Sequence, residues 1–308
     1  MIGETRTGAF DRDSGRARLP DRWGMASGPD GVRVAFDVYG TGNPTILLLP
    51  ASPIIHSRHW KAQVHYLSRH YRVVTFDGRG NGRSDRPTDP TAYSDERVIG
   101  DVEAVMDATG TDRAVLVGLC VDGVWRSIRL AAAKPERVLA IVAFAVGVPL
   151  LSPRHPWRDG HDFEEELPKY EGWAQINRHA WQRDYPAFAR FFFDAVTSEP
   201  HSTKAIEDAV SWALDGSVDA MLADADAPMD LDRDGIEAIC RSVSRPMLLV
   251  HGTKDHCQPI ARAQRLAELT GAPLVVVDGA DHMIPGRHPV LANLLIRDFV
   301  RSLQETPP

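Results

Sequence analysis

The alternation of short apolar runs with helical segments is the feature that most restricts what this chain can fold into. Residues 45–49 read TILLL and residues 72–76 read RVVTF, and both runs have the length and composition of strands buried on two faces. Apolar side chains recur with helical spacing at 60–67 and at 96–108. Strands that alternate with helices predict a mostly parallel central sheet with helices on both faces, which is an α/β fold.

The same alternation continues toward residue 148 and returns after residue 245. A strand is also expected at 32–39, after the turn sequence PDG. The further strands are expected at 114–117, 139–146, 246–250 and 274–277, and the further helices at 124–133, 260–269 and 290–303.

Composition divides the chain into three parts. Residues 1–24 are polar and without periodicity, so they are expected to form a flexible lead-in. Residues 25–148 and 245–308 are expected to form the α/β core. Residues 149–244 contain no short apolar strand but hold several Trp and Phe residues among charged ones.

The aromatic middle part predicts a helical insertion. We expect it to form a lid over an apolar pocket, with Trp157 and Trp181 among the side chains that line the pocket. A second small packing layer, in which the aromatic side chains mainly hold the insertion together, is the alternative.

Charge and composition limit the class of partner. The chain has 308 residues, of which 43% are hydrophobic and 25% charged, as in an ordinary globular protein. Its net charge of −7 argues against nucleic acid or an anionic membrane as the main partner. We therefore expect a small-molecule substrate, no nucleic acid and no membrane; the oligomeric state is left open.

The three cysteines indicate a reducing compartment. Cys120, Cys240 and Cys257 are far apart in the sequence and odd in number, which does not suit a disulfide framework. The cytoplasm is the expected location. No paired-cysteine metal spacing is present, so neither a metal nor another cofactor is expected.

The sequence VGLCVDG at 117–123 predicts the nucleophile of an enzyme. It follows the strand expected at 114–117 and precedes a helix, which is the setting of the G-x-S-x-G nucleophile elbow, here with Cys120 in place of serine. Small neighbours let strand and helix approach, and the helix N-terminus offers N–H groups and a positive dipole end to an anion. A thiolate suits this position. The alternative is a buried structural cysteine.

Three motifs together resemble the α/β-hydrolase family, over nearly the whole chain outside the lead-in and the lid. FDGRGNGRS at 76–84 resembles the family's D-x-R-G-x-G-x-S turn. HGTKD with a following proline, at 251–259, resembles the loop that presents the acid, and GADH at 279–282 resembles the loop that presents the histidine. The chain order of nucleophile, acid and histidine is the order of the family.

This resemblance implies a Cys120–His282–Asp255 triad. His282 would take the proton of the thiol or hold the thiolate in an ion pair, and it would later protonate the leaving group. Asp255 would orient His282 and stabilise its charged form. The rival acids and histidines are Asp278, Asp281, His251, His256 and His288.

The resemblance also implies an oxyanion hole built from two backbone N–H groups. Val121 follows the nucleophile and is expected to supply one. The second is expected from Ser52, by position, although relatives have His-Gly where this chain reads PASP. His56 and Trp60 follow this loop and are expected at the mouth of the pocket.

Asp122 stands where the family's elbow normally has a small residue. The favoured interpretation is that it caps the helix, and the alternative is a carboxylate beside the active site that opposes thiolate formation. Relatives that open epoxides or displace halides use an aspartate nucleophile. Asp122 lies two residues beyond that position, so those reactions are not expected.

The predicted activity is hydrolysis of a small, apolar or aromatic ester, thioester or lactone through an S-acyl intermediate. Cysteine-using members of the family include dienelactone hydrolases and polyhydroxyalkanoate synthases, and the synthases favour a second possibility, transfer of the acyl group to an acceptor other than water. A third possibility is a catalytically inactive ligand-binding or receptor protein on the same fold.

Overall fold

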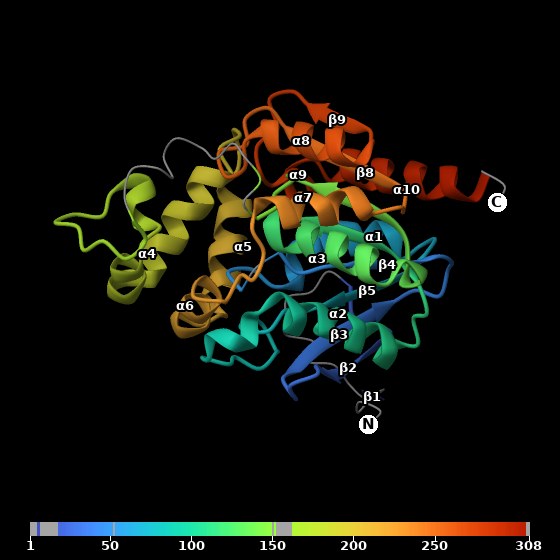
Figure 1. Ribbon diagram of the computed structural model, residues 1–308, viewed down its shortest axis with the longest axis horizontal. Coiled ribbons are helices and arrows are strands. Elements are labelled where there is room, and N and C mark those ends of the chain that lie inside the picture. Colours follow the sequence, from blue (N-terminus) through green and yellow to red (C-terminus); the bar gives the residue numbers. More distant parts are fainter. Residues whose placement is uncertain (1–4, 7–17, 52, 150, 152–161, 306–308) are drawn as a thin grey trace.

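A computed structural model describes residues 5–6, 18–51, 53–149, 151 and 162–305 of the chain (Figure 1). Its centre is a nine-stranded sheet in the order β1-β2-β3-β5-β4-β6-β7-β8-β9. The strands are β1 (Thr5–Arg6), β2 (Arg22–Ser27), β3 (Arg33–Tyr39), β4 (Thr45–Leu48), β5 (Arg72–Phe76), β6 (Ala114–Leu119), β7 (Val138–Phe144), β8 (Met247–Gly252) and β9 (Leu274–Val277). The pairs from β5 to β9 along this order are parallel, and β1, β2 and β3 add antiparallel pairs at one edge.

Strand β4 shows why these segments read as continuous apolar runs. It lies between β5 and β6, so both of its edges are hydrogen-bonded, and a core cluster covers each face of the sheet. Ile46 and Leu48 belong to the core cluster on one face of the sheet, while Leu47 and Leu49 belong to the cluster on the other, and none of the four is exposed. A strand that serves two cores cannot alternate with polar residues.

The helices cover both faces of the sheet, so the predicted α/β architecture is confirmed. Helices α1 and α10 contribute to one core cluster, and α2, α3, α7 and α8 contribute to the other. The helices are η1 (Ser57–Trp60), α1 (Lys61–Leu67), η2 (Pro90–Tyr93), α2 (Asp95–Thr109), α3 (Cys120–Ala133), η3 (Pro135–Arg137), η5 (Gly172–Gln175), α4 (Arg178–Val196), α5 (Thr203–Leu214), α6 (Val218–Ala225), α7 (Arg233–Ser242), α8 (Ile260–Thr270), α9 (Ile284–Arg287) and α10 (Pro289–Glu305).

The described part of the segment between β7 and β8 contains helices joined by loops, and no strand. Helices α4, α5 and α6 gather at one end of the molecule, beside the sheet (Figure 1). Helix α7 does not belong with them, because Ile236 and Cys240 are buried in the core cluster that α3 and α8 share. The predicted lid boundary at residue 244 is therefore wrong for α7, which is a helix of the core.

The core also begins earlier than predicted. Strand β2 pairs antiparallel with β3 from Arg22, three residues before the expected boundary at residue 25. The sequence RWGMAS of β2 is short and does not alternate between apolar and polar residues, so it gives no clear strand signal. No helix in the described part of the chain is both long enough and apolar enough to cross a membrane.

Candidate active site

The elbow between β6 and α3 presents Cys120. Helix α3 begins at Cys120 itself, four residues earlier than predicted, and Cys120 has a positive φ of 60°. Such a conformation costs a non-glycine residue about 1–3 kcal/mol. A Cβ atom placed on Gly118 would lie 2.3 Å from the carbonyl oxygen of Gly123, so only glycine fits there. The close approach of strand and helix thus fixes the thiol at the N-terminal end of α3.

Asp255 and His282 come from two loops beyond neighbouring strands. Asp255 follows β8, and His282 lies between β9 and α9. The distance from His282 Nδ1 to Asp255 Oδ2 is 2.8 Å, and both side chains are buried. The other carboxylate oxygen of Asp255 accepts hydrogen bonds from the backbone N–H groups of Cys257 and Gln258, each at 2.8 Å. This leaves Nε2 of His282 as the ring nitrogen that can serve the thiol.

The same two loops bring a second thiol to the site. The sulfur atoms of Cys120 and Cys257 and a ring nitrogen of His282 all lie within 4.8 Å of one another. Nε2 of Gln258 donates to both sulfurs, at 3.8 Å to Cys120 and 3.6 Å to Cys257. The sequence interpretation missed Cys257 as a site residue, and the only available signal was its place two residues after the predicted acid.

The electrostatics of the site favour a charged imidazole. Burial lowers the pKa of His282, but the Asp255 carboxylate and the two sulfurs outweigh it and hold this pKa well above its ordinary value. Burial raises the pKa of Asp255, and the neighbouring His282 outweighs that effect, so the pKa is lowered overall.

The two thiols titrate as a pair. The hydrogen bond between Cys120 and Cys257 and the His282 cation stabilise the first thiolate that forms, so the first pKa is lowered. Burial and the negative charge already present raise the pKa of the second thiol. The pair therefore favours one shared negative charge beside the imidazolium.

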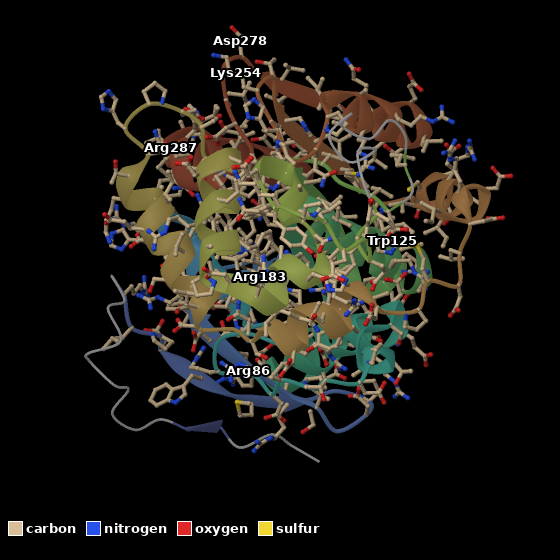
Figure 2. The ribbon with its side chains drawn as sticks, turned by 90° about the vertical axis from the view of Figure 1, so that its left-hand side faces the viewer. Arg86, Trp125, Arg183, Lys254, Asp278 and Arg287 are labelled. Carbon is tan, nitrogen blue, oxygen red and sulfur yellow. The ribbon has the colours of Figure 1, made fainter. Side chains whose placement is uncertain are left out.

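The two rival acids have other partners. Asp281 accepts hydrogen bonds from the backbone N–H groups of Met283 and Glu199. Asp278 accepts from the hydroxyl of Thr253 and lies at the outer edge of the molecule (Figure 2). Neither hydrogen-bonds His282 in the way that Asp255 does.

The rival histidines do not occupy the position of His282 beside the thiols. His251 accepts from the Val146 N–H at 2.9 Å through Nδ1, and its Nε2 donates to the carbonyl of Gln258. Both ring nitrogens are thus used, and burial lowers its pKa. His288 pairs with Glu199, and His256 is exposed.

The predicted pocket mouth is wrong for His56 and Trp60. Trp60 is fully buried, and its indole N–H donates to the carbonyl of Leu49 at 2.8 Å, so it is a core residue that holds the end of β4. His56 is 3% exposed and lies 3.2 Å from Asp215 and 3.8 Å from Asp77. Both side chains support the loop after β4 rather than facing solvent.

Of the two predicted oxyanion donors, Val121 is half-buried at the second position of α3, directly after Cys120. Ser52 lies outside the described residues. Trp157, predicted to line the pocket, also lies outside them.

Trp181 lies on α4 in an aromatic group, with ring centroids 5.0 Å from Phe163 and 4.9 Å from Phe188. It is buried, and its indole nitrogen has no hydrogen-bond partner among the described residues. Cys120 packs against the same hydrophobic cluster that contains Trp181 and Phe188 of α4. The surroundings of the thiol on this side are therefore apolar.

Asp122 lies in the first turn of α3 and not at its cap, which is Leu119. Its carboxylate is 3.6 Å from Arg126, and burial raises its pKa. The predicted capping role is therefore wrong, and Asp122 is a partly neutralised carboxyl on the elbow helix.

Comparison with known proteins agrees with the α/β fold of the chain. Residues 44–289 match the family model described as alpha/beta hydrolase fold. A non-heme chloroperoxidase of Streptomyces lividans is 25% identical over 91% of this chain and all of its own length, and a bifunctional esterase/perhydrolase of Acinetobacter calcoaceticus is 24% identical over the same shares. The crystal structure of the enol-lactonase from Burkholderia xenovorans LB400 superposes with a TM-score of 0.71 at 21% identity, over 90% of this chain and 99% of the other.

Proposed function

Because the chain belongs to the α/β-hydrolase fold family, we propose that it is a hydrolase that cleaves a small apolar or aromatic ester, thioester or lactone through an acyl group carried on Cys120. One observation carries the proposal. A strained cysteine at the elbow lies in one cluster with a histidine whose other ring nitrogen is bound by a buried carboxylate.

The chemistry follows the positions of these groups. His282 Nε2 takes the thiol proton, and the sulfur attacks the carbonyl carbon, which places a negative charge on the carbonyl oxygen. The N–H of Val121, with Ser52 as the second proposed donor, would bind that oxygen. His282 then protonates the departing alcohol or thiol. In the second half, water attacks the S-acyl group, His282 accepts the proton of the water, and the thiolate leaves.

The surroundings favour an acyl group that is apolar. The aromatic side chains of α4 share a hydrophobic cluster with Cys120. Esterase and enol-lactonase are also the activities that the names of two similar proteins state for those proteins. Because Cys120, Cys240 and Cys257 are all free thiols, we further propose a reducing cytoplasmic location.

Intact-mass measurement after brief mixing with activated aryl esters and acyl thioesters tests the proposal. The wild type should gain one acyl mass, and Cys120→Ala should gain none. Cys240→Ala is the matched control, because Cys240 is buried in the opposite core, and it should acylate as the wild type does. His282→Ala should acylate about 10²–10⁴-fold more slowly.

Two results would decide against it. An adduct that remains in Cys120→Ala would place the nucleophile elsewhere, and the absence of both adduct and turnover with the whole panel would favour a ligand-binding protein. An adduct that water does not release, but that an added alcohol, thiol or amine does, would identify an acyltransferase.

A further inference from the structure

Three metal-binding atom types meet at one point of the site. Two thiol sulfurs and one imidazole nitrogen, from Cys120, Cys257 and His282, lie within 4.8 Å of one another. Two thiolates and an imidazole are a ligand set that thiophilic divalent cations, Zn²⁺ above all, prefer. No pair of these residues has a recognisable metal spacing in the sequence, because the loops after β6, β8 and β9 bring them together only in the fold.

The spacing of the three atoms is close to that of a tetrahedral site. With Zn–S bonds of about 2.3 Å and Zn–N bonds of about 2.0–2.1 Å, neighbouring ligand atoms lie roughly 3.5–3.8 Å apart. Atoms that are already within 4.8 Å can reach this separation by shifts of about 1 Å or less. Side-chain torsions alone can supply shifts of that size.

The residues around the cluster already orient the ligands. Asp255 binds Nδ1 of His282 at 2.8 Å, which directs the other ring nitrogen toward the sulfurs and forms the carboxylate–histidine pair common beside bound metals. Gln258 donates to both sulfurs through Nε2, while its Oε1 accepts from the buried Arg262 at 2.6 Å and so fixes the direction of the amide.

The charge of the three side chains and their exposure to solvent suit a cation that keeps one coordination position open. Two thiolates balance a divalent charge. Binding releases two protons to the solvent, one from the remaining thiol and one from the His282 imidazolium, because a metal binds thiolates and a neutral imidazole. Cys257 and His282 are nearly buried, whereas Cys120 is partly exposed, so an ion would enter on the Cys120 side. Three protein ligands leave the fourth position for water.

We propose that Cys120, Cys257 and His282 form a binding site for one Zn²⁺-like cation, and that the bound cation blocks acyl transfer. The block follows because the sulfur of Cys120 and Nε2 of His282 cannot bind a metal and react with a carbonyl group at the same time. The metal site itself rests on the geometry and not on the proposed hydrolase activity.

Titration of the reduced protein with Co²⁺ under anaerobic conditions tests the site without any substrate. The wild type should bind one Co²⁺ per chain, with near-ultraviolet sulfur-to-cobalt charge-transfer bands and the strong visible bands of tetrahedral Co²⁺. Zn²⁺ should abolish both by displacing the Co²⁺. The affinity should rise with pH, because protons compete for the thiolates.

Variants separate this site from any other. Cys257→Ala should lose the charge-transfer bands and weaken binding by more than about 100-fold, since loss of an outer partner alone costs about 10–100-fold. Asp255→Asn, which removes only such an outer partner, should weaken binding by about 10–100-fold. Cys240→Ala is the control and should bind as the wild type does, because burial raises the pKa of that thiol to about 12 and it is far from these loops.

A wild type without charge-transfer bands, or a Cys257→Ala variant with unchanged bands, would overturn the proposal. If Cys257→Ala does not fold, alkylation of the wild type decides, since Zn²⁺ should protect Cys120 and Cys257 from iodoacetamide and unprotected thiols would count against the site. Acylation of the metal-free protein is a separate measurement, so either proposal can fail while the other stands.

Discussion

Cys120 can occupy the elbow because two neighbouring residues, Gly118 and Gly123, have no side chain. Its backbone φ of 60° is one that residues other than glycine rarely adopt. The surrounding backbone can hold this conformation because Gly118 and Gly123 allow β6 and α3 to approach closely. The position of the Cys120 thiol thus depends on the absence of a Cβ atom at these two glycines, and a single added methyl group there should disturb it.

The elbow predicts a sharp effect of Gly118→Ala. The new Cβ would lie 2.3 Å from a carbonyl oxygen, so strand and helix must separate, and we expect the free energy of unfolding to fall by about 1–3 kcal/mol together with the rate of acylation. Gly286→Ala is the matched control, because an added Cβ there meets no atom within 4 Å. Urea unfolding and the rate of acyl-adduct formation measure the two effects. Equal behaviour of the two variants would contradict this account of the elbow.

Single residues also mark the limit of prediction from the sequence. The proposed triad could be named because its three motifs have a fixed order in the chain. Cys257 could not, because its contact with Cys120 depends on how the loops beyond β6 and β8 fold together. Trp60 was misplaced for a related reason, since its position after the oxyanion loop does not show that its side chain turns inward.

At the scale of elements, a carboxyl group on helix α6 is influenced by the charge of a carboxyl group on the elbow helix α3. Burial and the charge of Asp122 outweigh Arg126 and raise the pKa of Asp224 on α6 to about 8. The pKa of Asp122 on α3 is raised as well, by burial. The two carboxylate charges repel each other, so the fold is more stable when Asp224 is protonated.

The raised pKa of Asp224 predicts how stability changes with pH. Between about pH 4 and 8 the folded state keeps a proton on Asp224 that the unfolded state has released, so this group lowers the free energy of unfolding as pH rises. Asp224→Asn should remove that dependence and stabilise the protein at pH 8 by at least about 1 kcal/mol. The exposed Asp219 on the same helix offers a control, Asp219→Asn. Urea unfolding at several pH values would refute the idea if both variants kept the wild-type slope.

Most strands and helices could be predicted because each has its own local pattern. The strands that are buried on both faces read as unbroken apolar runs, and the long helices show apolar side chains on one side. Helix α7 was assigned to the wrong part because an amphipathic pattern shows that a face is buried but not which element buries it. Strand β2 is not predicted from the sequence, because its backbone hydrogen bonds to β3 leave little trace in side-chain type.

At the scale of the whole molecule, Arg79 joins three distant segments. It comes from the motif after β5 and binds Asp101 of α2 through two hydrogen bonds of 2.7 Å, and it also binds Asp30 of the turn between β2 and β3. The side chains of Arg79 and Asp101 are almost fully buried. The motif thus has a structural role that connects the antiparallel edge of the sheet to the helical layer.

Removal of this arginine should therefore affect global stability. Arg79→Ala leaves the buried carboxylate of Asp101 without its cation, and we expect the free energy of unfolding to fall by about 3–5 kcal/mol. Arg33→Ala is the control, because Arg33 forms a similar two-bond pair with Asp85 but on the surface, where such a pair contributes about 0–1 kcal/mol. Urea unfolding compares them, and an equal loss in both variants would contradict the role of burial.

The Asp255 carboxylate ties two parts of the site to one side chain. One of its oxygens positions His282, and the other holds the backbone at Cys257 and Gln258. A substitution of Asp255 would therefore disturb both His282 and the loop that holds Cys257. The loops after β8 and β9 thus depend on one shared side chain, and neither can lose it without a change in the other.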